Sequence, residues 1–148
     1  MTEFKSILIP IDFSQYCDQA TDYASWFAKH TDAIIHAVHV VTNPADALYE
    51  PQEVPYWVMV EHAEKKAREM LEAAMQRCLP TSVRREVHVL QGDPYDKIMD
   101  TAKAVDADLI VMTTHGRGGV MHLVMGSVAE KIVRHAPCAV FIVRRTKE

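Results

Sequence analysis

The chain has 148 residues, of which 49% are hydrophobic and 24% charged, and these values predict one globular domain spanning residues 1–148. A formal net charge of −4 argues against a broad basic surface for nucleic acid, and no apolar run approaches the roughly 20 residues of a membrane helix. The three cysteines, an odd number without CxxC spacing, argue against a disulfide framework or a zinc site, so we expect a cytoplasmic protein.

Apolar runs alternate with amphipathic segments along the whole chain. In order, they predict a strand at residues 4–9, a helix from about 14 to 30, a strand at 33–41 and a helix at 54–78. A strand at 83–90, a helix at 94–105, a strand at 108–113, a helix from 127 to about 136 and a strand at 138–143 follow. Nearly continuous apolar strands alternating with helices are typical of a parallel sheet. We therefore predict an α/β fold, a single-domain Rossmann-like five-stranded parallel sheet with helices on both faces.

Three of the predicted helices begin at capping signals. Ser14 or Asp12 can cap the first helix, and Asp93, which a proline follows, marks a clear start for the third. Ser127 and Glu130 have the spacing of a capping box, in which each side chain accepts a hydrogen bond from the other's backbone amide. We therefore expect Ser127 to cap the fourth helix.

The most informative segment follows the predicted strand at residues 108–113. It contains His115-Gly116-Arg117-Gly118-Gly119, and Gly126-Ser127 comes later, at the start of the fourth helix. A glycine-rich turn between a strand and a helix can point backbone N–H groups at an anion, commonly a phosphate. Glycine suits such a turn because a Cβ hinders left-handed dihedrals and the close approach of a ligand. The segment favours nucleotide binding, although the glycines could also serve only to form a turn.

In open doubly wound sheets, ligands bind beyond the carboxyl ends of the strands, where the strand order reverses. Here Pro10-Ile11-Asp12 after the first strand and the glycine-rich segment after the fourth would supply that crevice. If these strands are neighbours, Asp12 faces the glycine-rich segment and can accept hydrogen bonds from a ribose hydroxyl or an adenine amine. The alternative is that Asp12 merely caps the first helix.

Three separate segments carry a family resemblance. Residues 7–14 match the opening Ile-Leu-x-Pro-x-Asp-x-Ser of universal stress proteins, and His39-Val40 matches the His-Val that ends their second strand. The ATP-binding branch of that family has Gly, two residues, Gly, nine residues and then Gly-Ser or Gly-Thr. Thr113, Gly116 and Gly126-Ser127 occupy this frame. The chain thus resembles a universal stress protein over essentially its whole length.

The resemblance implies a site, an assembly and a function. It implies the family's adenine nucleotide alpha hydrolase-like fold, with the first and fourth strands adjacent and two protomers paired through the last strand, residues 139–143. ATP, with Mg²⁺ arriving on its phosphates, would be the regulatory ligand of a dimeric stress-response switch with at most slow hydrolysis. The residues expected at the nucleotide site are Pro10, Ile11, Asp12, Val40, Thr113, His115, Gly116, Arg117, Gly126, Ser127 and Val128.

One position departs from the family pattern, because Thr113 stands where the ATP-binding branch has its first glycine. Its β-branched side chain would either crowd the ribose or turn away from the ligand. Another branch lacks the glycines and holds no ATP, so a nucleotide-free dimeric interaction module is the alternative function. In the loop itself, His115 could donate to a phosphate and Arg117 could screen its charge, or both could have no contact with a ligand.

The sequence carries no recognisable motif of an enzyme. The P-loop Gly-Lys-Ser/Thr and the Gly-x-Ser-x-Gly elbow are both absent, and Ser127 has no base partner in the sequence. A phosphoacceptor receiver domain would need an acidic pair after the first strand, where only Asp12 stands. The histidines show no metal-ligand spacing, and His36 and His39 fall on opposite faces of a strand. We therefore expect a binding protein with neither catalytic residues nor a metal site.

Overall fold

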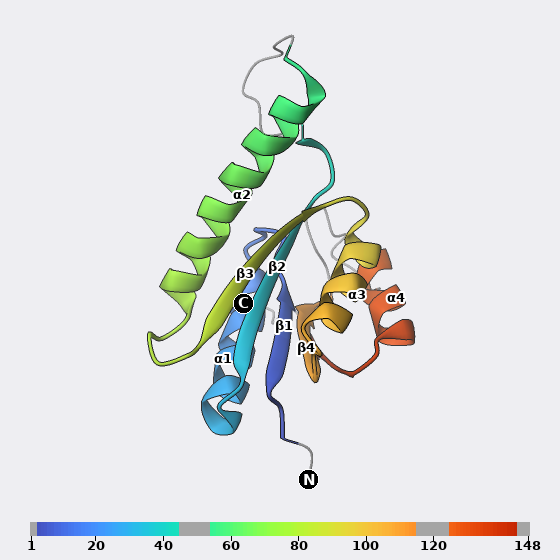
Figure 1. Ribbon diagram of the computed structural model, residues 1–148. Coiled ribbons are helices and arrows are strands. Elements are labelled where there is room, and N and C mark those ends of the chain that lie inside the picture. The colour runs from blue at the N-terminus through green and yellow to red at the C-terminus, as the bar shows by residue number, and fades with distance from the viewer. Residues whose placement is uncertain (1–2, 45–53, 115–124, 145–148) are drawn as a thin grey trace.

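The computed structural model describes residues 3–44, 54–114 and 125–144. A central sheet carries helices on both faces (Figure 1). The strands in these ranges are β1 (Ser6–Pro10), β2 (Ile34–Val41), β3 (Arg85–Gln91), β4 (Leu109–Thr113) and β5 (Ala139–Val143), and all pair in parallel. The helices are α1 (Cys17–Thr31), α2 (Tyr56–Cys78), α3 (Pro94–Ala104) and α4 (Ser127–His135). The predicted α/β class and its five-stranded parallel sheet are confirmed.

The strands lie in the order β3-β2-β1-β4-β5. The chain first builds the half from β1 to β3 and then crosses back to place β4 on the other side of β1. The order therefore reverses between β1 and β4, where Ile7 pairs with Leu109 and Leu8 with Ile110. Because the connections leave these two strands in opposite directions, a crevice opens at their carboxyl ends. The expectation that the first and fourth strands are neighbours is confirmed.

Alternate residues of β1 contribute to two separate cores. Ile7 and Ile9 are fully buried in the layer between the sheet and the helices α1 and α2. Leu8 faces the other way and is buried with Ile98 of α3 and Ile132 of α4. Burial on both faces explains why this strand is apolar without alternation. Within the described ranges, no helix combines the length and the apolar character needed to cross a bilayer.

The start of α1 differs from the prediction. The helix begins at Cys17, and its N-cap residue Tyr16 makes no side-chain capping bond, so neither Asp12 nor Ser14 caps it. The Asp12 carboxylate instead accepts a hydrogen bond from the Ser14 amide at 2.9 Å. Between these two residues Phe13 has a φ of 62°, in the left-handed region. A tight turn therefore separates β1 from α1, and Asp12 belongs to that turn rather than to the helix.

The expected capping box of α4 is also wrong. Ser127 is already helical, and Gly126 occupies the N-cap position. The Glu130 amide donates to the Gly126 carbonyl at 3.0 Å, while the Glu130 carboxylate accepts from Arg134 at 2.8 Å. A shift of one residue thus places a glycine, which has no side chain to accept a bond, at the cap. By contrast, Asp93 caps α3 as predicted.

Candidate functional site

A cleft of about 710 Å³ lies at the carboxyl ends of the central strands. Its walls come from the segment after β1, the ends of β2 and β4, one side of α2 and the starts of α3 and α4. This volume falls within the roughly 300–1,000 Å³ of ordinary small-molecule sites. The cleft also lies where the reversal of strand order predicts a ligand.

The cleft gathers most of the residues that the sequence predicted for the site. They are Pro10, Ile11, Asp12, Val40, Thr113, Gly126, Ser127 and Val128. The other three, His115, Gly116 and Arg117, lie outside the described residues. Pairing of β1 with both β2 and β4 brings together segments that are far apart along the chain.

Asp12 is held at the cleft by the turn after β1. Its Oδ1 atom accepts hydrogen bonds from the Ser14 amide at 2.9 Å and from the Cys17 thiol at 3.1 Å. Burial raises the pKa of the Cys17 thiol to about 11, and the charge of Asp12 adds to the rise, so the thiol keeps its proton at neutral pH. These donors help to orient the carboxylate, and a carboxylate oxygen can accept a hydrogen bond from a hydroxyl or an amine.

His39 stabilises the same turn from the end of β2. Its Nδ1 atom lies 2.7 Å from the carbonyl oxygen of Ile11, and its ring packs against Phe13 with the centroids 4.4 Å apart. Because a carbonyl only accepts, Nδ1 carries the proton in this contact. His39 therefore links β2 to the segment that carries Asp12, which gives a physical role to the His-Val motif of the sequence.

The first turn of α4 forms another wall of the cleft. The Gly126 amide donates to the Thr114 carbonyl at 2.8 Å, so this N–H is not directed at a ligand. Ser127 and Val128 follow, and backbone amides in a first turn have no intrahelical carbonyl to bind. Such amides, together with the positive end of the helix dipole, attract an anion. This wall therefore suits a phosphate group.

The backbone at Gly126 does not require a glycine. Its φ of −60° and ψ of 156° are open to any residue, so the expectation of a left-handed turn is wrong at this position. The other reason for a glycine, the absence of a side chain beside an approaching ligand, still applies. A substitution at Gly126 can therefore test ligand binding without straining the backbone.

One wall of the cleft comes from α2, none of whose residues was predicted for the site from the sequence. The cleft residues of this helix are Ala63, Lys66, Ala67 and Met70. Among the described residues that line the cleft, Lys66 is the only lysine or arginine. Lys66 lies three residues after the buried Ala63 and therefore on the same face of the helix. This spacing was the signal in the sequence that Lys66 borders the packed side of α2. Only packing shows that this edge of the helix borders a cleft rather than open solvent.

A second polar cluster, His36, Glu86 and His88, lies outside the residues that line the cleft. Burial lowers the pKa of His36, the neighbouring His88 lowers it further, and Glu86 opposes the shift. Burial also lowers the pKa of His88, and Glu86 again opposes the shift while Arg68 adds to it. The two histidines are 52 positions apart in the chain and meet only through strand pairing. Strand pairing therefore brings together two histidines whose spacing in the sequence shows no relation between them.

The strand order and the cleft at its switch point define a Rossmann-like α/β protein with a cleft at the carboxyl edge of its sheet. The universal stress protein family model matches residues 3–144, and the chain belongs to this family. Universal stress protein MJ0531 of Methanocaldococcus jannaschii is 32% identical over 146 residues, which cover 98% of this chain and 85% of that protein. A universal stress protein of Thermus aquaticus is 36% identical over 143 residues, which cover 95% and 99% of the two chains.

Solved structures of similar proteins share the fold. The universal stress protein UspA of Lactobacillus plantarum has a TM-score of 0.77 and 27% identity, with 97% of this chain and 100% of that chain covered. A universal stress protein solved in complex with cAMP has a TM-score of 0.63 and 20% identity, covering 97% and 98%. The universal stress protein of Archaeoglobus fulgidus solved in complex with dAMP has a TM-score of 0.58 and 19% identity, covering 95% and 98%.

Proposed function

We propose that the chain binds an adenine nucleotide, ATP with Mg²⁺, in the cleft and uses it as the regulatory ligand of a dimeric stress-response switch. The observation that carries the proposal is the juxtaposition of the Asp12 carboxylate and the first turn of α4 in one cleft. The carboxylate can accept from ribose hydroxyls or from the adenine amine, and the helix amides can bind phosphates. One wall of the cleft thus suits a nucleoside and another wall suits an anion.

Each wall has a role in this arrangement. Pro10, Ile11 and Val40 provide an apolar surface for the adenosine, and the amides of Ser127 and Val128 bind phosphate oxygens. Lys66 supplies a positive charge from α2, which a triphosphate with several negative charges needs. Mg²⁺ would be held by phosphate oxygens and water, because this ion rarely has an all-protein site.

The comparison with known structures supports an adenine ligand. The two related structures whose ligands are cAMP and dAMP share the fold of this chain. The step from these monophosphates to ATP rests on the cleft volume, on Lys66 and on the resemblance to the ATP-binding branch. Thr113 lies at the cleft, and its side chain must leave room for the ribose. With no assigned catalytic residue, turnover should be at most slow.

The proposed dimer uses the strand β5. This strand stands at one end of the sheet order, where its outer edge can pair with a second copy of the chain. Residues Ala139–Val143 would then continue the sheet across two protomers. Light scattering on the purified protein tests this assembly, and a mass equal to one chain of 16.7 kDa would contradict it.

The experiment that tests ATP binding is a thermal melt with and without millimolar ATP and magnesium, on the wild type and on Gly126→Val. A ligand at about 100 times its Kd adds roughly 2.7 kcal/mol to the free energy of unfolding. For a domain of this size the melting temperature should rise by roughly 5–10 °C. The backbone of Gly126 accepts valine, so the variant should melt near the wild type without nucleotide and show no rise with it.

The same melts distinguish the alternative function, a nucleotide-free dimeric interaction module. Such a module has no use for the cleft, so neither protein would respond to ATP. Extraction and chromatography of bound nucleotide from the starting material excludes a site that is already filled. No response in protein shown to carry no nucleotide would favour the interaction module.

A further inference from the structure

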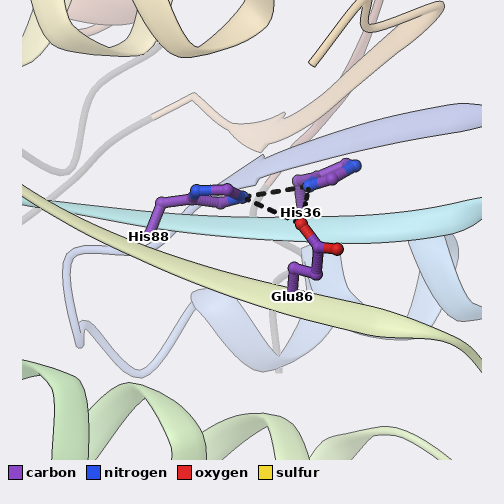
Figure 2. A group of neighbouring side chains, drawn as sticks. All are labelled: His36, Glu86 and His88. Atoms are coloured by element: carbon purple, nitrogen blue, oxygen red, sulfur yellow. Dashed lines mark hydrogen bonds and ion pairs between the residues drawn. The ribbon is translucent and has the colours of Figure 1, made fainter. Parts of the chain in front are cut away.

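Three side chains with metal-binding atoms meet on the paired strands β2 and β3. Figure 2 shows His36 on β2 pointing toward Glu86 and His88 on β3. In the parallel register His36 is the partner of Glu86, and Val38 is the partner of His88. Residues that are paired, or two positions apart along a strand, project from the same face of a sheet. Strand pairing therefore determines that the three side chains converge.

The ligand atoms have the separations of a small coordination site. The His36 Nδ1 atom lies 2.9 Å from His88 Nε2 and 3.5 Å from Glu86 Oε2, and the last two atoms are 4.0 Å apart. In a tetrahedral zinc site with bonds of about 2.0–2.1 Å, the ligand atoms lie about 3.3 Å from one another. The three distances lie around this value, so small side-chain rotations would place all three atoms on one ion.

We propose that His36, Glu86 and His88 form a site for a divalent transition metal ion, Zn²⁺ being the ion that this donor set fits best. Two imidazoles and one carboxylate are a known three-ligand set for zinc, with water at the fourth position. The ion would replace the contact between the two rings. It would connect β3, the last strand at this end of the sheet, to β2.

The cluster offers both a rigid ligand and an entry path. The His36 side chain is only 8% exposed and is held within the sheet, whereas the side chains of His88 and Glu86 are 27% and 59% exposed. An ion can therefore reach the site from solvent. None of the three residues lines the nucleotide cleft, so the metal site does not depend on the proposed function.

Zinc titration of the EDTA-treated full chain at pH 7.5 tests the proposal. Calorimetry should show one Zn²⁺ per chain with a Kd tighter than about 10 µM. Substituting a residue that only hydrogen-bonds to a metal ligand lowers metal affinity about 10–100-fold. Glu86 and His88 would be ligands themselves, so Glu86→Gln and His88→Gln should weaken zinc binding by at least that much. His62→Gln, at an exposed position on α2, is the matched control and should bind as the wild type does.

A second measurement separates coordination from folding. His88 and Glu86 are the more exposed members, and melts in EDTA should show that both variants remain folded. Saturating zinc should raise the melting temperature of the wild type and of His62→Gln but not that of the two ligand variants. Cobalt should give the visible absorption of a tetrahedral site in the wild type and lose it in His88→Gln. A wild type that takes up no zinc, or ligand variants that bind as tightly as His62→Gln, would show that the cluster is only a hydrogen-bonded histidine pair.

Discussion

The helices α3 and α4 each follow a strand of the sheet along the chain, yet their first turns are completed in different ways. In α3 the Asp93 side chain accepts a hydrogen bond from the Asp96 amide at 3.0 Å, so the protein supplies its own anion. In α4 the same position holds Gly126, which has no side chain, and the following residues line the cleft. Since a helix start favours negative charge, a missing cap beside a cleft is where a ligand's anion can bind. In the proposed function, this uncapped start beside the cleft is where the phosphates bind.

The most direct test of this difference is to give α4 the cap that α3 has. In Gly126→Asp the new carboxylate would bind the first-turn amides and repel a phosphate about 5 Å away by roughly 3 kcal/mol at an effective dielectric constant of about 20. ATP affinity should fall more than about 100-fold, while the nucleotide-free protein melts no lower than the wild type. Calorimetry with ATP checks the affinity. Unchanged binding would place the phosphates elsewhere.

Asp12 tests another wall of the same cleft. Asp12→Asn keeps the shape of the side chain but removes its charge and replaces one acceptor oxygen with a donor. Hydrogen bonds to charged groups contribute about 1.5–3 kcal/mol, so ATP affinity should fall about 10–100-fold. Inorganic triphosphate, which lacks the nucleoside, should bind the variant at least as well as the wild type. If both ligands lose affinity equally, Asp12 does not contact the nucleoside.

The cap of α3 is the converse case, in which stability should change and binding should not. Asp93→Ala leaves the Asp96 amide without its acceptor and should lower the free energy of unfolding by about 1 kcal/mol. ATP affinity should stay within about twofold of the wild type, because Asp93 does not line the cleft. Urea unfolding measures the first effect and calorimetry the second. A large loss of ATP affinity would mean that both helix starts bind the ligand.

The smallest expected effect concerns the thiol that orients Asp12. The pKa of Cys17 is about 11 in the folded chain against its usual 9.0, so the folded chain holds the thiol proton more tightly than the unfolded chain does. The resulting stabilisation is fully present below pH 9 and is lost as pH rises toward 11. This thiol should therefore cost about 0.8 kcal/mol of stability at pH 9.5 relative to pH 8. Urea unfolding at both pH values should show a smaller decrease in Cys17→Ala. An equal decrease in the two proteins would mean that the thiol titrates normally.

Local signals predicted what depends on neighbours along the chain. The five strands and four helices follow from apolar runs and helical spacing, and all except α1 begin within about two residues of the predicted positions. The cap at Asp93 was predicted because an aspartate followed by a proline is a local signal for a helix start, and its partner amide is only three residues away. The cap of α4 was not, because Gly126 and Ser127 are adjacent and the sequence does not show which of them ends the preceding loop.

The α/β class, the residues of the strands and the segments that carry Asp12 and Gly126 could all be predicted from the sequence. The surfaces that these segments face became visible only in the folded chain. Folding placed Lys66 at the cleft rather than in open solvent, and it brought His36 beside His88 across 52 residues of chain. This division arises because the periodicity of helices and strands follows from local backbone geometry, whereas a binding site depends on strand order and register. Those are set by the burial of both faces of the sheet at once.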